Sequence, residues 1–325
     1  MTRKVEVAIE SWPLMEPFVI TGHRWTHCDI VVVSVTEGDC TGRGEATGVY
    51  YLDETAESMK EQLMAIHHDL EQGVTREQLL SVLPVGGARN ALDCALWDLE
   101  AKQSGESIFS LTGLSDSPVE SVTTVTIDSP SEMAKKARAI PGTQIKVKLD
   151  DELALERITA VCTARPDADI IIDVNEGWSF AQLVELAPKF KALGVKMIEQ
   201  PLPRGEDSAL DDYQSPITLC ADESCLDTSD LAQVAGRYQM INIKLDKTGG
   251  LTEALSLAHQ AKEMGMTLMV GNMVGTSLAM APGYVIAQLC DTVDLDGALF
   301  LEGDRPFGME YRDGIVYAPA STLWG

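Results

Sequence analysis

The stretch "TQIKVKLD", Thr143 to Asp150, alternates apolar with polar and charged residues, so Lys146 and Lys148 emerge on the same side of a predicted strand. The flanking "TQI" and "VKL" fit the interior of a barrel wall better than the alternative, an edge strand that faces solvent. Burial of an unpaired ammonium group is costly. Two adjacent lysines on such a strand therefore need partners on the other strands of the same sheet.

Short apolar strands of this kind recur from about residue 120 to residue 297, and each is followed by an amphipathic helical segment. Eight strands at this spacing predict an α/β fold, a (β/α) barrel. The alternative is a doubly wound open sheet, but the Gly-rich phosphate turn expected after its first strand is missing. The predicted strands are "SVTTVTI", "QIKVKL", "DIIIDV", "VKMIEQ", "ITLCAD", "MINIKL", "MTLMVG" and a short one near "TVDLDG".

Residues 1–115 have a different pattern, in which strands are followed by helices. "KVEVAIESW" and "DIVVVSVTE" alternate like strands, whereas "TAESMKEQLMAIHHDLEQG" and "ARNALDCALWDLEAKQSG" have helical periodicity. We therefore expect an α+β domain over residues 1–115 and a barrel domain over 116–299. The tail, 300–325, is too short for another domain and is expected to pack on the N-terminal unit.

Composition excludes several classes of function. The chain has 325 residues, 45% of them hydrophobic, and a net charge of −25, which disfavours binding to nucleic acid or to anionic membrane. No signal peptide and no apolar run of about 18 residues is present, so we expect a cytoplasmic protein. Its seven cysteines are scattered without CxxC spacing, which argues against a disulfide framework or a zinc site.

Ionisable residues end predicted strands two to six. They are Lys148, Asp173, Glu199, Asp222 and Lys244, separated by 25, 26, 23 and 22 residues, so each lies one βα unit after the previous one. The carboxyl ends of barrel strands form the rim where active sites lie. A single acidic residue at such a position is more often a helix N-cap. Three in register indicate a site instead.

Asp173, Glu199 and Asp222 are expected to converge on one point. Three adjacent carboxylates repel one another unless a cation lies between them. Oxygen ligands without His or Cys favour one Mg²⁺ ion that keeps coordination positions for water and substrate oxygens. We therefore predict one divalent cation at this rim.

Lys148 and Lys244 lie four strands apart in a ring of eight and so are expected to face each other across the mouth. This arrangement suits the movement of a proton between opposite faces of one carbon. An ordinary lysine has a pKa near 10.4, and Lys146 is expected to lower the pKa of Lys148. Lys247 either acts similarly on Lys244 or is a solvated residue at a helix start.

These residues resemble the enolase superfamily, specifically its muconate-lactonizing subgroup, over the whole chain. The subgroup has Lys-x-Lys on strand two, Asp, Glu and Asp metal ligands on the next three strands, and Lys on strand six. The resemblance implies a modified (β/α)7β barrel of the TIM type, with a capping domain formed by the N-terminal segment and the C-terminal tail. It also implies a homo-oligomer.

Within this subgroup, "ARNALDCALWDLEAK", "IKVKLD", "EQPLP", "CADESC" and "NIKLDKTGGLTEAL" resemble dipeptide epimerases of the L-Ala-D/L-Glu type. In that family the two lysines interconvert the stereocentre of the second residue, and the dipeptide carboxylate chelates the metal. The resemblance therefore implies that Lys148 and Lys244 are catalytic and that Asp173, Glu199 and Asp222 bind Mg²⁺.

The motif "DLDG" places Asp294 and Asp296 at the end of strand eight, opposite strand four. A ligand that spans the mouth would meet the metal at one end and these two carboxylates at the other. A free α-ammonium group is the natural partner of such a pair, and in the family it is the N-terminus of the dipeptide. The alternative is an Asx-turn before Gly297.

Two loops of the capping domain are expected to set specificity. "VITGHRWTHCD" holds Arg24 and Trp25; in the Ala-Glu enzymes an arginine here pairs with the substrate glutamate, and alignment on "PFVI" places Trp25 at that position. "TGVYYLDET" offers Tyr50, Tyr51 and Asp53. We also assign Lys146 and Thr124 to the substrate site, and Asn175 and Glu223 to the surroundings of the metal ligands.

The sequence thus favours a Mg²⁺-dependent dipeptide epimerase that acts by 1,1-proton transfer on L-Ala-L-Glu, L-Ala-D-Glu or a related L-Ala-L-Xaa dipeptide. Recycling of cell-wall peptides is the role that the resemblance implies. The alternatives are o-succinylbenzoate synthase, N-succinylamino acid racemase and muconate cycloisomerase, whose substrates have no ammonium group for Asp294 and Asp296. A dipeptide-binding protein without activity is a further alternative, but binding alone requires no lysine on both faces of one carbon.

Overall fold

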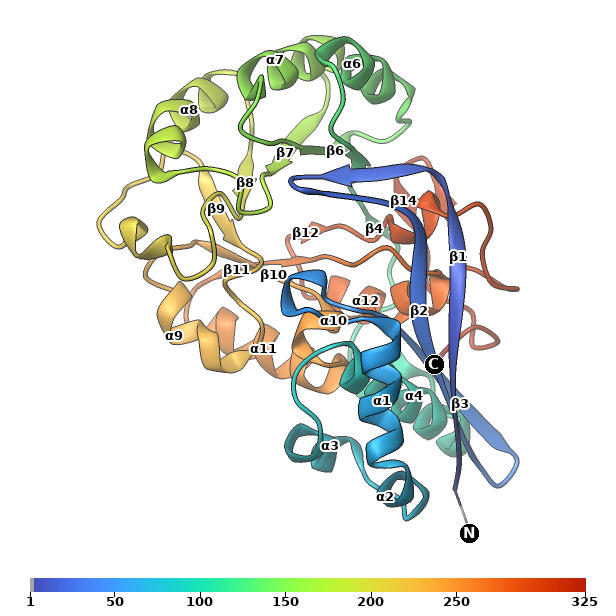
Figure 1. The fold of residues 1–325 in the computed structure, drawn as a ribbon. Helices are drawn as coiled ribbons and strands as arrows, with labels where there is room; N and C mark the ends of the chain where they lie inside the picture. The colour runs from blue at the N-terminus through green and yellow to red at the C-terminus, as the bar shows by residue number, and fades with distance from the viewer. Residues whose placement is uncertain (1–2) are drawn as a thin grey trace.

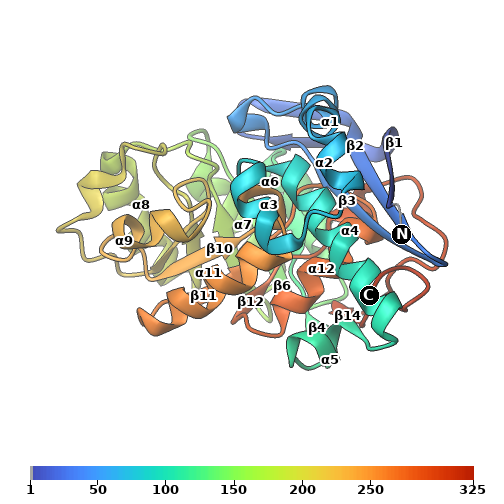
Figure 2. The same cartoon turned by 90° about the horizontal axis from the view of Figure 1, so that it is seen from below.

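The computed structural model describes residues 3–325, which form a capped barrel (Figure 1). An antiparallel sheet and a group of helices from the N-terminal third lie beside an eight-stranded parallel sheet that curls into the barrel. Seen from below, the N-terminal sheet and helices gather on one side of the barrel (Figure 2). The predicted fold class is confirmed.

The N-terminal sheet has the order β1-β2-β3 and is packed by one long helix, α4. Glycines on β3 permit this packing, because a Cβ atom on Gly44 would lie 2.0 Å from the carbonyl oxygen of Ala91, and one on Gly42 would lie 2.1 Å from that of Ala95. The elements are β1(Lys4–Ile20), β2(His23–Glu37), β3(Cys40–Thr47), η1(Tyr50–Leu52), α1(Ala56–Ala65), α2(His67–Glu71), α3(Arg76–Val82), α4(Gly87–Ser104) and α5(Ile108–Thr112).

Several features of this domain differ from the sequence-based expectation. Strand β3 and helix α3 were not predicted, and the first predicted helix is divided at Ile66 into α1 and α2. The segment expected to be a loop around Arg24 is instead the end of the β1–β2 hairpin, in which Ile20 pairs with His23 and Val19 with Arg24. Only Thr21 and Gly22 form the turn.

All eight predicted barrel strands are present, and all are parallel. The backbone N–H of Val122 donates to the carbonyl of Val293 over 2.8 Å, which joins the first strand region to the last. The strands are β5(Thr123–Val125), β6(Gln144–Lys148), β7(Asp169–Asp173), β8(Met197–Glu199), β9(Thr218–Ala221), β10(Met240–Ile243), β11(Thr267–Val270) and β12(Thr292–Val293).

Helical segments follow these strands and cover the outside of the barrel (Figure 1). They are α6(Pro130–Ala139), α7(Ala154–Ala164), α8(Phe180–Ala192), η2(Asp207–Leu210), η3(Thr228–Asp230), α9(Leu231–Val234), α10(Leu245–Thr248), α11(Leu251–Glu263), α12(Ser277–Ala287) and η4(Gly297–Phe300). Among residues 3–325, none of the helices has the length and apolar character needed to cross a membrane.

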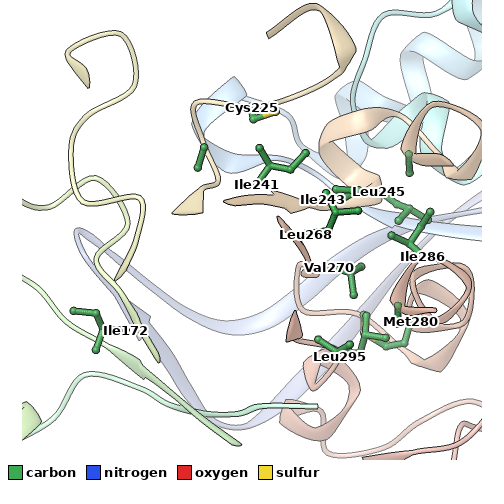
Figure 3. Close-up of a cluster of buried hydrophobic side chains, with 14 of the residues drawn as sticks. Ile172, Cys225, Ile241, Ile243, Leu245, Leu268, Val270, Met280, Ile286 and Leu295 are labelled. Carbon is green, nitrogen blue, oxygen red and sulfur yellow. The ribbon is translucent and has the colours of Figure 1, made fainter. Parts of the chain in front are cut away.

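Strict alternation along the strands divides the barrel core into two parts. Outward residues such as Ile241, Ile243 and Val270 belong to the same buried cluster as residues of the outer helix α12 such as Met280 and Ile286 (Figure 3). A separate cluster is formed by residues in and beside the strands that alternate with the outward set, namely Val122, Ile171, Met197, Cys220, Met240 and Met269. We call this set the lower layer of the barrel interior.

The C-terminal tail returns to both parts of the molecule. Its strand β14(Ile315–Val316) pairs on one side with β13(Tyr311–Arg312) and on the other with β4(Val119–Glu120). Trp324 Nε1 donates to the carbonyl of Cys94 on α4 over 3.0 Å, and the backbone N–H of Gly325 donates to Asp98 over 2.8 Å. These contacts agree with the expected return of the tail to the N-terminal unit.

Candidate active site

Three carboxylates end adjacent strands above the lower layer. Asp173 ends β7, Glu199 ends β8 and Asp222 follows β9; all three are fully buried. One oxygen from each lies within 4.8 Å of the others. The strand register places them together, since Asp173 is paired with Glu199 and each lies two residues beyond a member of the lower layer.

Four lysines surround these carboxylates. Lys146 Nζ lies 3.0 Å from Asp173, 2.8 Å from Glu199 and 2.8 Å from Asp294. Lys148 Nζ donates to Asp173 over 2.6 Å and to Asn175 Oδ1 over 3.0 Å. Lys146 and Lys148 can both be buried on the same face of β6 because their ammonium groups share the Asp173 carboxylate.

Lys244 and Lys247 hold the third carboxylate. Lys244 Nζ donates to Asp222 Oδ2 over 2.6 Å, and Lys247 Nζ donates to Asp222 Oδ1 over 2.6 Å. Lys247 also donates to the carbonyls of Asp222 and Asn242 and is fully buried. The interpretation of Lys247 as a solvated residue at a helix start is therefore wrong.

Electrostatics differ among the three carboxyl groups. Burial raises the pKa of Glu199 to about 7, and the charge of Asp173 adds to this effect. Burial opposes ionisation of Asp173 and Asp222 too, but neighbouring lysines hold the pKa of each well below its usual range: Lys146 and Lys148 for Asp173, Lys244 and Lys247 for Asp222.

The donor set suits a single hard cation. All three candidate ligand atoms are carboxylate oxygens, which Mg²⁺ prefers. Nearby, Asn242 donates from Nδ2 to Glu199 Oε1 over 2.7 Å and orients that carboxylate. Four lysines and four carboxylates, counting Asp294, balance in charge. A bound divalent cation would make the cluster positive and thereby favour an anionic ligand.

Two more carboxylates lie after β12. Asp294 Oδ2 accepts from Lys146, whereas Asp294 Oδ1 is buried with no hydrogen-bond partner. Asp296 Oδ2 accepts from the backbone N–H of Thr124 over 2.7 Å. Burial, together with the charge of Asp294, raises the pKa of Asp296 to about 8. An additional donor or cation would satisfy this pair.

A cavity of about 350 Å³ connects these groups and is lined by residues of both domains. Its size falls within the range of small-molecule sites. From the barrel, the lining includes the strand-end groups already described: Lys146, Lys148, Lys244, Asn175, Thr124, Asp294 and Asp296. From the N-terminal domain and the tail it includes several aromatic rings.

The aromatic rings come from the hairpin end, from η1 and from η4. Trp25 and Tyr50 line the cavity with ring centroids 5.4 Å apart, and Phe18 lies edge-on to Phe300 at 4.9 Å. Arg24 is exposed and does not line the cavity, because alternation along β2 turns it away from the side of Trp25. The structure therefore brings Trp25 to the cavity and leaves Arg24 outside it.

Sequence reasoning missed Asn242 and Asp246. Asn242 lies on β10, two residues before Lys244, which directly follows the strand, so period-two alternation was a signal that it shares the interior face. Asp246 accepts from the backbone N–H of Thr47 and from Asn90, both in the N-terminal domain. No local sequence pattern indicates these long-range contacts. The other predicted residue, Glu223, is buried and accepts from Asn175 Nδ2 over 3.3 Å.

A barrel with a capping sheet, buried acidic groups on three successive strands and lysines on either side of them defines the enolase-like class of folds and sites. Family models agree: residues 2–113 match the mandelate racemase / muconate lactonizing enzyme N-terminal domain, and residues 131–321 match the enolase C-terminal domain-like family. The chain belongs to the enolase superfamily.

Similar proteins include an epimerase and a racemase. The chain is 43% identical over 319 residues to the L-Ala-D/L-Glu epimerase of Escherichia coli (strain K12), covering 97% of this chain and 99% of that protein. It is 44% identical over 303 residues to the N-acetyl-D-glutamate racemase of a Pseudoalteromonas species, covering 91% and 95%.

A crystal structure from Agrobacterium tumefaciens has a TM-score of 0.97 at 40% identity and covers 99% of this chain and 100% of that chain. It is an enolase family member with homology to dipeptide epimerases, solved with sodium and L-Ala-L-Glu bound. The family assignment made from the sequence motifs is confirmed.

Proposed function

We propose that this protein is a Mg²⁺-dependent dipeptide epimerase that inverts the α-carbon of the second residue by 1,1-proton transfer. The observation that carries the proposal is that Lys148 and Lys244, four strands apart, line one cavity, and that the three candidate metal ligands lie at the ends of the strands between them. A proton taken from one face of a carbon and returned to the other requires groups on both sides.

Asp173, Glu199 and Asp222 are the residues that would hold Mg²⁺. When bound, the ion supplies electrostatic stabilisation of the negative charge that develops on the substrate carboxylate. Asn242 keeps the Glu199 carboxylate oriented, and Lys247 does the same for Asp222. Lys146, beside Asp173 and Glu199, adds positive charge for the same carboxylate group.

The proton steps belong to Lys148 and Lys244. One lysine, as the neutral amine, removes the α-proton, and its nitrogen becomes an ammonium group. The opposite lysine, as the ammonium group, donates a proton to the other face of the same carbon and becomes neutral. The dipeptide leaves with inverted configuration and unchanged composition.

Asp294 and Asp296 favour a free amine over an N-acyl amino acid as the substrate. This distinction matters because the two relatives act on the two kinds of compound. Asp294 Oδ1 is buried without a partner, and a second carboxylate lies beside it. A dipeptide ammonium group offers a positive charge and three donors, whereas an N-acetyl amide offers one N–H and no charge.

The second residue is proposed to be glutamate or a related side chain, as in the Escherichia coli relative. Trp25 and Tyr50 line the part of the cavity that the capping domain supplies, so they would contact that side chain. The free cysteines favour a reducing, cytoplasmic location. A homo-oligomer stays a prediction, for which sedimentation velocity is the measurement.

Incubation with Mg²⁺ in D₂O tests the function. We expect L-Ala-L-Glu or a neighbouring dipeptide to gain one deuterium by mass spectrometry and to yield the second diastereomer, and a chelator to stop both. N-acetylglutamate is included as the competing substrate. Deuterium gained by N-acetylglutamate but by no dipeptide would move the assignment to N-acyl amino acid racemisation.

A further inference from the structure

Helix α4 of the capping domain has two different buried faces. Its apolar face contributes to the core of the capping domain. Arg89, Asn90 and Asp93 are also buried, with 5%, 3% and 1% exposure, but they contact the barrel segment that follows Lys244. Buried polar side chains need hydrogen-bond partners, and here most of the partners lie in the barrel between Asp246 and Thr252.

Each of these three residues makes a specific contact. Arg89 Nη2 donates to the carbonyl of Thr248 over 2.7 Å, and its Nε donates to that of Gly249 over 3.2 Å. Asn90 Nδ2 donates to Asp246 Oδ1 over 3.1 Å. The contacted residues lie two to five positions after Lys244, so the cap holds the chain directly beyond this lysine.

Asp93 extends the contact to the start of α11. It accepts from the backbone N–H of Thr252 over 2.9 Å and from the Thr252 hydroxyl over 2.6 Å. The approach between the helix and the turn is close, because a Cβ atom on Gly249, whose φ is +73°, would lie 2.3 Å from Arg89 Nε. Lys244 itself is the N-cap residue of the short helix α10, so movement of this turn would move the lysine.

Lys148 is held differently. Its neighbour Leu149 donates from the backbone N–H to the Asp173 carbonyl over 2.9 Å, and Asp150 is paired with Arg157 of α7. The capping domain reaches this segment through Thr21, whose hydroxyl lies 3.3 Å from the Leu149 carbonyl. The chain after Lys148 is therefore held mainly by barrel residues. The turn after Lys244 is held by α4 of the cap, whereas Lys244 Nζ donates to the barrel residue Asp222.

We propose that Arg89 and Asn90 are positioning residues for Lys244 and not for Lys148, acting through Thr248, Gly249 and Asp246. This inference rests on the proposed epimerase function. It goes beyond that function by coupling one of the two proton-transfer groups, and only one, to the capping domain. The consequence is an asymmetry between the two α-proton exchange reactions, one for each diastereomer of the dipeptide.

The asymmetry follows from the two-lysine arrangement. Each lysine removes the α-proton of one diastereomer, because each faces one side of the carbon. Displacement of Lys244 slows proton removal from the diastereomer that Lys244 serves, and misplacement of a reacting group by about 1 Å can cost about 100-fold. Proton removal by Lys148 from the other diastereomer continues.

The test compares α-proton exchange in D₂O for L-Ala-L-Glu and L-Ala-D-Glu, each given separately to the full-length protein with Mg²⁺. Lys244→Ala and Lys148→Ala first identify the diastereomer that each lysine serves. We expect Asn90→Leu and Arg89→Met to slow exchange of the Lys244-dependent diastereomer at least about tenfold more than that of the other. Asn90→Ser serves if Asn90→Leu does not fold.

Two matched variants separate positioning from general destabilisation. Asp98→Asn lies on the same helix and is equally buried, but Asp98 contacts Arg43 and Gly325 rather than the Lys244 turn, so the ratio of the two exchange rates should not change. Asp246→Asn keeps an oxygen that can accept from Asn90 and Thr47 and should retain the parent ratio, whereas Asp246→Leu should shift it in the same sense as Asn90→Leu.

Equal slowing of both diastereomers, no slowing, or a shift in the sense of Lys148→Ala would overturn the positioning role while leaving the epimerase assignment intact. Absence of dipeptide exchange in the parent protein would overturn the epimerase assignment, and this inference with it.

Discussion

The two layers of the barrel interior are built from the same strands and yet have opposite chemistry. Ile171, Met197 and Cys220 of the lower layer lie two residues before Asp173, Glu199 and Asp222. Because side chains alternate along a strand, both residues of each pair face the interior. The apolar lower layer and the charged cluster are therefore only two residues apart along each strand. The lower layer excludes water below the site, and this raises the strength of every ionic contact above it.

This difference shows that stability and chemistry have been separated along the strand axis. In barrels of this type the C-terminal rim carries function and the opposite end carries stability. We call the charged cluster above the lower layer the upper layer. Substitutions in the upper layer should therefore mainly affect the reaction, and those in the lower layer mainly the free energy of unfolding. Four predictions test how far stability and chemistry are separated between the two layers.

Asp173→Asn should have the largest effect. It removes one candidate metal ligand and the shared partner of Lys146 and Lys148. Loss of about 4 kcal/mol of transition-state stabilisation corresponds to about a 1,000-fold lower rate. The measurement is the initial rate of dipeptide epimerisation at saturating Mg²⁺. The control is Asp169→Asn, the same change at the exposed opposite end of β7, which should leave the rate unchanged. A loss of rate below tenfold in Asp173→Asn would contradict the separation of chemistry and stability.

Lys247→Met should break the separation, because it is an upper-layer residue with a structural role. Lys247 is fully buried and donates to three oxygens, so its removal takes one donor from Asp222 Oδ1 and one from each of two buried carbonyls. We expect the free energy of unfolding in urea to fall by about 3–5 kcal/mol. The exposed Lys262→Met should change it by less than about 0.5 kcal/mol, and a comparable loss in both variants would refute the role assigned to Lys247.

Met240→Ala probes the lower layer alone. Met240 is 7% exposed and belongs to the lower layer. Removal of its side chain should lower the free energy of unfolding by about 3 kcal/mol through lost burial and a residual cavity. The rate of epimerisation by folded protein at 25 °C should stay within about twofold of the parent value, whereas Met264→Ala, an exposed methionine, should change neither quantity. A large loss of rate in Met240→Ala would mean that the layers are not independent.

Asp246→Asn should have the smallest effect, and it depends on pH. Burial raises the pKa of Asp246 from 3.8 to about 7, so the folded protein binds this proton more tightly than the unfolded chain. The resulting stability is complete below pH 3.8 and is lost as pH rises through about 7. The asparagine variant lacks this dependence, so between pH 5 and pH 6.5 its stability relative to the parent should rise by about 2 kcal/mol. A difference that stays constant with pH would show that Asp246 is ionised throughout.

Much of the barrel and of its rim was predictable from the sequence. The eight strands were located because alternation and strand-to-strand spacing are local properties. Asp173, Glu199 and Asp222 were predicted to meet because the carboxyl ends of parallel strands share one rim, and the structure brings their oxygens within 4.8 Å. Topology alone also places Lys148 and Lys244 on opposite sides of the ring.

Other features depended on contacts between distant residues. Strand β3 was missed because Gly42 and Gly44 have low strand propensity, and the close approach of α4 is what selects them. Arg24 was assigned to the substrate site, but pairing within the hairpin turns it outward and Trp25 inward. The burial of Lys247 depends on Asp222, 25 residues earlier.

The sequence by itself determined the class of fold, the position of each strand end and the kinds of charged group that gather there, because these follow from periodicity and order along the chain. Only the tertiary structure decided which side chains face the cavity at the hairpin end and which carboxylate each of the four lysines pairs with. It also decided that α4 forms hydrogen bonds with the turn after Lys244. The contact between Asn90 and Asp246 spans 156 residues, and contacts of that length are set by the packing of whole domains rather than by any local pattern.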